Sequence, residues 1–435
     1  MLKSVHLKNF KLHEDTLIEA APITVFIGPN NTGKSSIFQA LLLLRQAASR
    51  NDLFLCQPPA GLMPAPTEPY QYSPQLTIDV GRFEEILRRV GDEVDFGFSG
   101  VVRARKRLGL VEEAAVNVQL RVRENQLVYH SGSLDTRGTK ANWQIVQGRP
   151  PQPSVIHLGG VKYLLQTSLT FQLIASGGYQ VDPFSLAPET LVEYNEASQW
   201  LGAVPNNLLR SVHPVFALRG FEEWGYPITE DRPTGLELMT LHDRAIALPN
   251  ALASDRRLKE KLSEQLEGLL HISVDFEVVP GRKLKIWAKH SDNKRGETLF
   301  ANEGSGANQI PFIFVPVLLT PPNETILLSE PEAHLHPKGQ SELTRMLLTI
   351  AKKENIQFFI ETHSEHVLHT ILNAVAKGEW NRDEVALHYF QNKNGTADVS
   401  RREINQFGQV DGGLPDFFEQ SLAELTEYLK AVSKA

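Results

Sequence analysis

The segment at residues 22–50 constrains the fold of this chain most strongly, because three kinds of sequence follow one another in a fixed order. Its sequence, PITVFIGPNNTGKSSIFQALLLLRQAASR, runs from a five-residue apolar strand through a loop of Gly and Asn into a helix rich in leucine. A strand, a loop and a helix in succession open an α/β domain. Between strand and helix, GPNNTGKS (Gly28–Ser35) fits the pattern G-x-x-x-x-G-K-[ST] in the structural context that the pattern requires. We call Gly28–Ser35 the phosphate loop.

The residue types of the phosphate loop suit the binding of ATP with its magnesium ion. Glycines let backbone N–H groups wrap the phosphates, Lys34 reaches the β- and γ-phosphates, and Ser35 can ligate Mg²⁺. The helix that follows points its positive end at the anion. The structural alternative is a glycine-rich turn with an incidental lysine, although a chance match to the pattern arises on the order of one or two per cent of the time. The residues predicted to bind the nucleotide here are Gly28, Pro29, Asn30, Asn31, Thr32, Gly33, Lys34, Ser35 and Ser36.

The composition is that of a soluble globular protein in a reducing compartment. The chain has 435 residues, of which 41% are hydrophobic and 22% charged, a size that accommodates roughly two to three domains. Its net charge of −7 does not indicate a surface coated with basic residues, although a basic patch on one face stays open. Cys56 is the single cysteine, which rules out an intrachain disulfide, so we expect a cytoplasmic protein.

No segment of the sequence indicates membrane insertion. The N-terminus, MLKSVHLKNFKLHEDTL, alternates apolar and polar residues, which predicts a strand rather than a signal peptide. The most apolar later run, IPFIFVPVLLTPP at 310–322, is too short to span a membrane and contains Pro311 and Pro316.

The middle of the chain changes periodicity twice. Residues 53–75 are rich in proline, which predicts an exposed loop. Short strand patterns from 76 to about 185 indicate an antiparallel sheet, with apolar residues at period two: Val116, Val118, Leu120 and Val122. Helical patterns dominate 186–270, where leucine recurs every fourth residue: Leu258, Leu262, Leu266 and Leu270.

The last third returns to α/β alternation. SVDFEVVPGRKLKIWAK at 273–289 predicts a hairpin that turns at Pro280 and Gly281. A helix is expected from NEGSGANQ onward, followed by strand 326–329, helix 338–353, strand 356–360, helix 364–377 and strand 384–390. This alternation implies parallel strands with helices on both faces.

Four motifs at the two ends of the chain, 1–50 and 299–435, appear in a family's order around the phosphate loop. They are NFK at 9–11, EGSGANQ at 303–309, EPEAHLHP at 330–337 and ETHSEH at 361–366. With them the chain resembles the ABC-type AAA-family ATPases of the RecF, SMC and OLD (overcoming lysogenization defect) group. It looks most like stand-alone members with a Pro-x-x-Phe-Phe element, here GGLPDFFEQSLAEL at 412–425. The chain ends too soon after ETHSEH for a Toprim nuclease domain, so the resemblance implies that any nuclease is a partner.

The resemblance implies an α/β fold, the ABC-type head of a P-loop NTPase, with a mixed sheet, an antiparallel β lobe and an inserted helical subdomain. We therefore expect five regions: 1–75, the N-terminal part of the head with the phosphate loop; 76–185, the β-rich lobe; 186–272, the helical insertion; 273–390, the C-terminal part of the head; and 391–435, a C-terminal tail.

The resemblance also implies an ATP site that two subunits share. Ser305 and Gly306 would belong to a signature loop that touches the γ-phosphate of ATP bound to a second subunit, with Gln309 following on the same helix. Such a site is complete only in a head-to-head dimer. The structural alternative is that Ser305 caps the helix, and the two roles can coexist.

Several histidines need separate interpretations. His363 resembles the switch histidine that senses the γ-phosphate, and it follows strand 356–360, where ligands of open α/β sheets bind. His366 and His369 lie on the same helix face, but nothing in the sequence brings a third ligand to this set, so a metal cluster is the weaker interpretation. His334 and His336 are interpreted as structural residues of the loop that faces the partner subunit.

Two further features have a functional and a structural interpretation. Phe10 and Lys11 match the place where relatives contact the adenine side of the nucleotide, but a core phenylalanine and a solvated lysine fit equally well. The basic residues of VVRARKR could form a nucleic-acid contact strip or a charged strand edge: Arg103, Arg105, Lys106 and Arg107.

The catalytic strand, ILLSEPEAHLHP at 326–337, departs from the family's pattern. Two acidic residues usually end it: the first holds magnesium through water, and the second polarises the attacking water. Aligned by Pro331, Glu330 keeps the second position, whereas Ser329 replaces the first and supplies no charge. Glu361, at the end of a strand expected to lie alongside, and Glu332 are the candidates to compensate as magnesium anchors.

These observations predict an ATP hydrolase that dimerises around ATP and turns it over slowly, with Glu330 and His363 as catalytic residues and Ser35, Ser329 and Glu361 at the Mg²⁺ site. The resemblance implies that it switches a DNA-associated or nuclease-partnered complex in bacterial anti-phage defence or DNA repair. The alternative is a non-hydrolysing, nucleotide-sensing scaffold that sequesters a toxic effector. A transporter's ATPase subunit is disfavoured, because over 200 residues separate the phosphate loop from Ser305.

Overall fold

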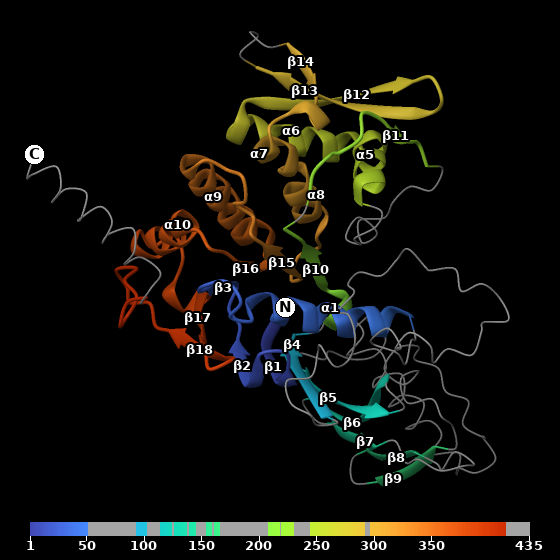
Figure 1. Cartoon of the computed structure of the whole chain (residues 1–435), viewed down its shortest axis with the longest axis vertical. Helices are drawn as coiled ribbons and strands as arrows, with labels where there is room; N and C mark the ends of the chain where they lie inside the picture. Colours follow the sequence, from blue (N-terminus) through green and yellow to red (C-terminus); the bar gives the residue numbers. More distant parts are fainter. Residues whose placement is uncertain are drawn as a thin grey trace, which may run out of the picture.

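A computed structural model describes eleven stretches of the chain. They are residues 1–50, 93–101, 114–123, 126–136, 139–144, 154–158, 161–165, 208–217, 219–229, 244–291 and 296–414. The fold is α/β, with one mixed sheet, one antiparallel sheet and a smaller unit of strands and helices. Figure 1 shows the antiparallel sheet and the smaller unit toward opposite ends of the long axis, with the mixed sheet between them.

The mixed sheet has six strands in the described residues, and it carries the segments that the sequence predicts to form the ATP site. Its order is β10 (Val212–Val215), β15 (Thr325–Ser329), β16 (Gln357–Glu361), β3 (Ile23–Ile27), β17 (Val385–Lys393) and β18 (Thr396–Arg402). The first five strands are parallel, and β18 pairs antiparallel with β17. Every residue of β3 and β16 is buried, which is why neither sequence alternates between apolar and polar residues.

Helices connect and cover these strands. They are α1 (Lys34–Arg50), α7 (Ser305–Gln309), α8 (Pro311–Leu319), α9 (Pro337–Glu354) and α10 (Glu365–Ala376). α9 and α10 pack against each other, as Figure 1 shows. α9 begins at the cap His336 and α10 at the cap Ser364, whose side-chain oxygen accepts from two backbone N–H groups of the first turn.

The antiparallel sheet confirms the β-rich lobe in kind, but not its predicted start. Its eight strands are ordered β2 (His13–Glu19), β1 (Leu2–Phe10), β4 (Glu93–Gly100), β5 (Ala114–Arg123), β6 (Gln126–Thr136), β7 (Thr139–Gln144), β8 (Ser154–Leu158) and β9 (Val161–Leu165). The first two strands, β2 and β1, come from the N-terminus, and they belong to this sheet because β1 pairs with β4 along its length. This sheet therefore begins at residue 2 rather than near residue 76.

The smaller unit consists of α5 (Arg244–Ser254), α6 (Arg256–Leu270), the hairpin β12 (Ile272–Val279) and β13 (Lys283–His290), and the short strands β11 (Tyr226–Pro227) and β14 (Glu297–Leu299). The predicted hairpin is confirmed, and Gly281 in its turn has a φ of 86°. In α6 the buried leucines are Leu258, Leu262, Leu266 and Leu269. Leu270 was predicted in this set, but a strict fourth-residue repeat drifts around a helix of 3.6 residues per turn.

The regions 186–272 and 391–435 are not purely the helical insertion and the tail that the sequence suggested. β10 lies within the first and belongs to the mixed sheet, and β17 and β18 carry that sheet to Arg402. β10 is a four-residue run with a proline, too short to show a period. Residues 53–75, the basic strip at 103–107 and residues 415–435 with the Phe-Phe element lie outside the described stretches.

The apolar run at 310–322 forms α8 and the turn after it. α8 has nine residues and is buried along most of its length. Among the helices that the structure describes, none has the length and apolarity needed to cross a membrane.

Candidate active site

The phosphate loop joins β3 to α1 at the carboxyl ends of the parallel strands. Gly28 has a φ of 139°, and a Cβ atom there would lie 2.1 Å from the carbonyl oxygen of Phe390 on β17. Gly33 has a φ of 97°, and its Cβ would lie 2.9 Å from Nε2 of His13. Both positions therefore require glycine for conformation and for space. Pro29, Asn30, Asn31 and Ser35 are exposed, whereas Thr32 and Ser36 are buried.

Lys34 is held inside the loop. Its Nζ atom donates to the carbonyl oxygens of Gly28 (2.9 Å) and Pro29 (2.7 Å), and the side chain is buried. Burial lowers the pKa of Lys34 to about 8, while the carboxylates of Glu361 and Glu330 act to raise it. The loop thus holds a cation whose charge is compensated only in part.

A carboxylate meets the phosphate loop one strand away from Ser329. The Ser35 hydroxyl donates to Oε1 of Glu361, the last residue of β16. In register, Glu361 is opposite Ser329 on one side and Phe26 on the other. Burial raises the pKa of Glu361, against the effects of the Ser35 hydrogen bond and of Lys34. The structure therefore places Ser35, Ser329 and Glu361 at one edge of the sheet, and the magnesium site there stays a prediction.

Glu330 and His363 lie at the same edge. Oε1 of Glu330 is 3.9 Å from Nε2 of His363, and the two side chains are 41% and 35% exposed. Burial, and then the charge of Lys34, lowers the pKa of His363, which favours the neutral imidazole, while the charge of Glu330 acts in the opposite direction. Glu330 has a φ of 44°, and its N–H donates to the carbonyl of Glu361 (2.8 Å).

Glu332 supports His363 and does not reach Ser35. Its Oε1 atom accepts from the Thr362 hydroxyl (2.5 Å) and from the N–H of His363 (3.1 Å). The side chain is buried, and its Oε2 atom has no hydrogen-bond partner among the described residues. Of the two carboxylates predicted to compensate for Ser329, Glu361 is the one beside Ser35.

The predicted signature segment packs on the loop that follows β15. Ser305 is exposed and is the first residue of α7, whose cap is Gly304, so the alternative in which Ser305 caps this helix is wrong. A Cβ on Gly306 would lie 2.7 Å from the carbonyl oxygen of His334. Nε2 of Gln309 donates to the carbonyl of Ala333. α7 and the loop 330–335 are thus in direct contact.

Two residues that the sequence did not single out hold this edge in place. Arg219, just beyond β10, donates to the carbonyls of Ser329 (2.9 Å) and Glu330 (2.6 Å). His13 is fully buried, and its Nε2 atom donates to the carbonyl of Gly33 (3.0 Å). No local pattern marks either residue, because each acts on a segment far away in the sequence.

The remaining predicted residues take structural places. Phe10 is fully buried, with its ring centroid 5.1 Å from that of Phe96, which supports the core interpretation. Lys11 donates to Oε1 of Gln39 (2.6 Å). Nδ1 of His336 accepts from the N–H of Lys338 at the start of α9, and His334 is exposed.

The metal-cluster alternative for His366 and His369 finds no support in the structure. In the stretches that are described, no group of three or more His, Cys, Asp or Glu side chains is arranged to hold a metal ion.

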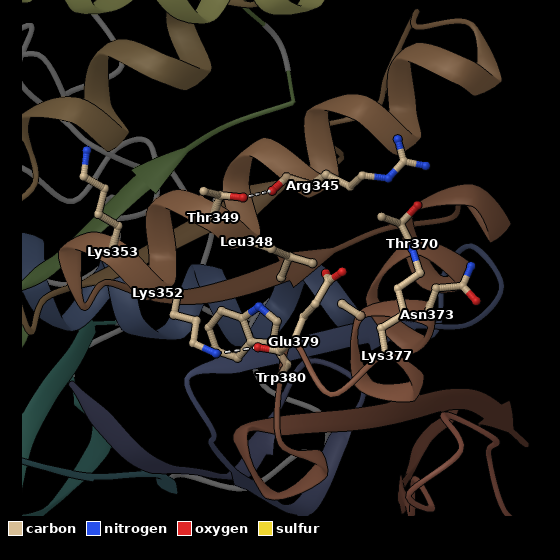
Figure 2. A pocket seen from close by; sticks show the side chains of 11 residues that line it. Arg345, Leu348, Thr349, Lys352, Lys353, Thr370, Asn373, Lys377, Glu379 and Trp380 are labelled. Atoms are coloured by element: carbon tan, nitrogen blue, oxygen red, sulfur yellow. Dashed lines mark hydrogen bonds between the residues drawn. The ribbon is translucent and has the colours of Figure 1, made fainter.

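A separate groove of about 590 Å³ lies between α9 and α10 (Figure 2). Arg345, Lys353 and Lys377 line it, and Lys352 donates to the carbonyl of Glu379 (2.5 Å) with its Nζ atom 5.6 Å from the ring centroid of Trp380. The lining includes none of the residues predicted for the ATP site.

Comparison with known families accounts for the two halves of this site. Residues 1–86 and 253–368 match the family described as AAA ATPase domain. The match covers less than half of the chain, in two segments. The first matched segment contains the phosphate loop, and the second contains Ser305, Ser329, Glu330, Glu361 and His363. Arg219 lies between the two matched segments. Residues 381–427 match a family described as a protein of unknown function (DUF3696).

Among solved structures the chain is similar to heads of SMC proteins at low identity. The SMC head domain from Thermotoga maritima has a TM-score of 0.42 at 14% identity, over 93% of this chain and 99% of that one. The SmcHead bound to the C-winged helix domain of ScpA has 0.45 at 13%, over 93% and 98%. The Smc head domain from Pyrococcus furiosus, bound to the C-terminal domain of ScpA, has 0.43 at 13%, over 98% and 99%. No curated protein matches the chain.

Proposed function

We propose that this protein is an ABC-type ATPase of the RecF, SMC and OLD kind, which closes as a head-to-head dimer around ATP and hydrolyses it slowly. The observation that carries the proposal is the contact between Ser35 and Glu361 beside Lys34. This contact brings a hydroxyl and a carboxylate from two distant segments together beside the phosphate loop. Ser329, at the end of the neighbouring strand, carries no charge.

The donor set fits magnesium and triphosphate. Backbone N–H groups of the phosphate loop and the ammonium of Lys34 would bind the phosphates. The Ser35 hydroxyl and the Glu361 carboxylate are hard oxygen donors, and Mg²⁺ is usually held by one or two carboxylates together with waters and substrate phosphates. When bound, the ion neutralises charge on the β- and γ-phosphates.

Glu330 and His363 supply the chemistry at the γ-phosphate. Oε1 of Glu330 orients the attacking water and accepts its proton as the new P–O bond forms and ADP leaves with the electrons of the broken bond. A ring N–H of His363 can donate to a γ-phosphate oxygen, and the lowered pKa of this histidine in the nucleotide-free protein favours the neutral imidazole. Ser305 and Gly306 of a second copy complete the site.

Slow turnover follows from Ser329. Glu361 restores the charge near the metal from a neighbouring strand rather than from the catalytic strand itself. Altered second-shell partners of a metal typically cost about 10–100-fold in affinity or activity. Steady-state phosphate release by the pure protein tests the proposal, and we expect turnover well below the enzyme median of about 10 s⁻¹. Turnover at that median without any partner would contradict slow hydrolysis.

The wider role rests on the family resemblance. We infer an effector or nuclease protein as the partner that the ATP-bound dimer switches, with DNA as a further candidate, in anti-phage defence or DNA repair. A scaffold that binds ATP without hydrolysis and sequesters an effector is the second candidate, because Ser329 favours it. Phosphate release measured with and without the partner separates the two: a scaffold releases none in either case.

A further inference from the structure

Arg219 fixes the backbone on both sides of Glu330. One of its terminal nitrogens donates to the carbonyls of Ser329 and Phe216, and the other donates to the carbonyl of Glu330. The guanidinium is largely buried, and its Nε atom has no hydrogen-bond partner among the described residues. A buried cation is unfavourable unless it is hydrogen-bonded. The buried position of Arg219 therefore indicates that the carbonyl groups it contacts have to be held in place.

These contacts hold the backbone conformation of Glu330. Its φ of 44° is unfavourable for a residue with a Cβ atom, and such strain persists only where the surroundings enforce it. Arg219 holds the carbonyl before the residue and the carbonyl of the residue itself, and Glu361 accepts from its N–H. These three contacts set the direction in which the Glu330 side chain leaves the strand toward His363.

The chain that carries Arg219 is also tied to α7. Two residues later, the N–H of Phe221 donates to Oδ1 of Asn308 (2.6 Å), and Nδ2 of Asn308 donates to the carbonyl of Phe221 (2.9 Å). Gly220, between Arg219 and Phe221, has a φ of 147°. The Phe221 ring packs on Phe312 at a centroid distance of 4.7 Å, which anchors this end in the core.

We propose that Arg219 is a positioning residue for Glu330, and that Arg219–Phe221 transmits the position of α7 to it. This inference rests on the proposed function. α7 begins with Ser305, the residue proposed to meet the ATP of a second subunit. A shift of α7 on dimerisation would therefore reach Glu330 in the same chain's own site, which couples the two shared sites.

The positioning role predicts a separation between binding and turnover. Arg219→Ala should lower kcat on the order of 10–100-fold and leave ATP affinity within about threefold, because the phosphate loop is untouched. Arg219→Lys should recover part of kcat, since one ammonium reaches the carbonyls without the planar fork that spans both. Loss of ATP affinity in proportion to kcat would overturn the role. Circular dichroism confirms that the variants are folded.

A double-mutant cycle tests transmission from α7. If Asn308 acts on Glu330 through Arg219, Asn308→Ala should lower kcat in the wild-type background and change it little in the Arg219→Ala background. Effects on kcat that multiply independently would overturn transmission. The matched control is Asn302→Ala, an exposed asparagine six residues earlier, which should leave kcat unchanged.

A measurement without nucleotide separates this inference from the proposed function. Amide hydrogen exchange of Glu330, whose N–H is bonded to the Glu361 carbonyl, reports the backbone that Arg219 holds. Asn308→Ala should speed this exchange by about tenfold or more, and Asn302→Ala should not. Unchanged exchange in Asn308→Ala overturns the inference even if the wild-type protein hydrolyses ATP. Absence of hydrolysis in the wild type overturns the proposed function and leaves the exchange result standing.

Discussion

The phosphate loop and the loop 330–335 lie at the same edge of one sheet, yet different forces hold them. The phosphate loop owes its shape mainly to its own residues, because Lys34 donates to the carbonyls of Gly28 and Pro29, and His13 adds a hydrogen bond from outside the loop. Gly28 and Gly33 occupy positions where neighbouring atoms leave no room for a Cβ. The loop 330–335 is held by side chains from remote segments, namely Arg219, Gln309 and, through Glu332, Thr362. The conformation of the phosphate loop therefore depends mainly on local sequence, whereas that of the adjacent loop 330–335 depends on tertiary contacts.

The largest effect should come from the loop 330–335, because the proposed chemistry depends there on the carboxylate of Glu330. Glu330→Gln keeps the shape of the side chain but cannot take the proton of the attacking water, so turnover should fall on the order of 10²–10⁴-fold. ATP binding should persist and trap the dimer, as seen by size-exclusion chromatography with ATP. A variant that elutes only as a monomer with ATP bound would contradict the shared site.

A substitution in the phosphate loop should instead weaken the binding of ATP. Lys34→Ala removes the ammonium from the loop, and hydrogen bonds to charged groups are worth about 1.5–3 kcal/mol, so ATP affinity should drop on the order of 10²-fold. Equilibrium binding of a fluorescent ATP analogue measures this. Lys338→Ala, on the exposed start of α9, is the matched control and should bind normally. Equal loss in both variants would remove the special role of Lys34.

Glu332 tests whether the loop 330–335 depends on the charge of this residue or on the hydrogen bonds that it accepts. Only its Oε1 atom accepts hydrogen bonds, and an amide oxygen can accept the same two. Glu332→Gln should therefore keep kcat within about threefold, whereas Glu332→Ala, which removes the acceptor of the Thr362 hydroxyl and of the His363 N–H, should lower it by about tenfold. If Gln and Ala were equally damaging, the charge of Glu332 rather than its position would matter.

The smallest effect concerns pH and the phosphate loop alone. The pKa of Lys34 in the nucleotide-free protein is lowered to about 8 by burial, so its ammonium is fully present below pH 7 and is lost as pH rises through 8. ATP affinity should then fall by up to about tenfold for each further pH unit. Affinity that stays constant from pH 7 to pH 9 would show that Lys34 keeps its proton throughout.

The sequence predicts the two loops unequally, for the same physical reason. The phosphate loop, the hairpin at 273–289 and the alternating elements after residue 325 are local patterns, and the structure contains them close to the expected bounds. The place of β10 in the mixed sheet and the pairing of β1 with β4 are long-range and leave no periodic signal. Arg219 and His13 stayed hidden because their partners lie far from them in the sequence.

The place of Glu361 was partly predictable. ETHSEH put a carboxylate at the end of a strand, and parallel strands end at one edge of a sheet. What the sequence could not supply is the order of the strands, which sets β16 between β15 and β3 and so brings Glu361 to Ser35.

Glu361, the carboxylate proposed to replace the one missing at Ser329, is the residue on which the proposed ATP site depends most. The direct test is a magnesium titration of nucleotide binding and of phosphate release in the wild type, in Glu361→Gln, and in Glu361→Gln combined with Ser329→Asp. Glu361→Gln should raise the magnesium concentration for half-maximal activity on the order of 10–100-fold, and adding Ser329→Asp should restore most of it. A Glu361→Gln protein with the magnesium dependence of the wild type would contradict the account.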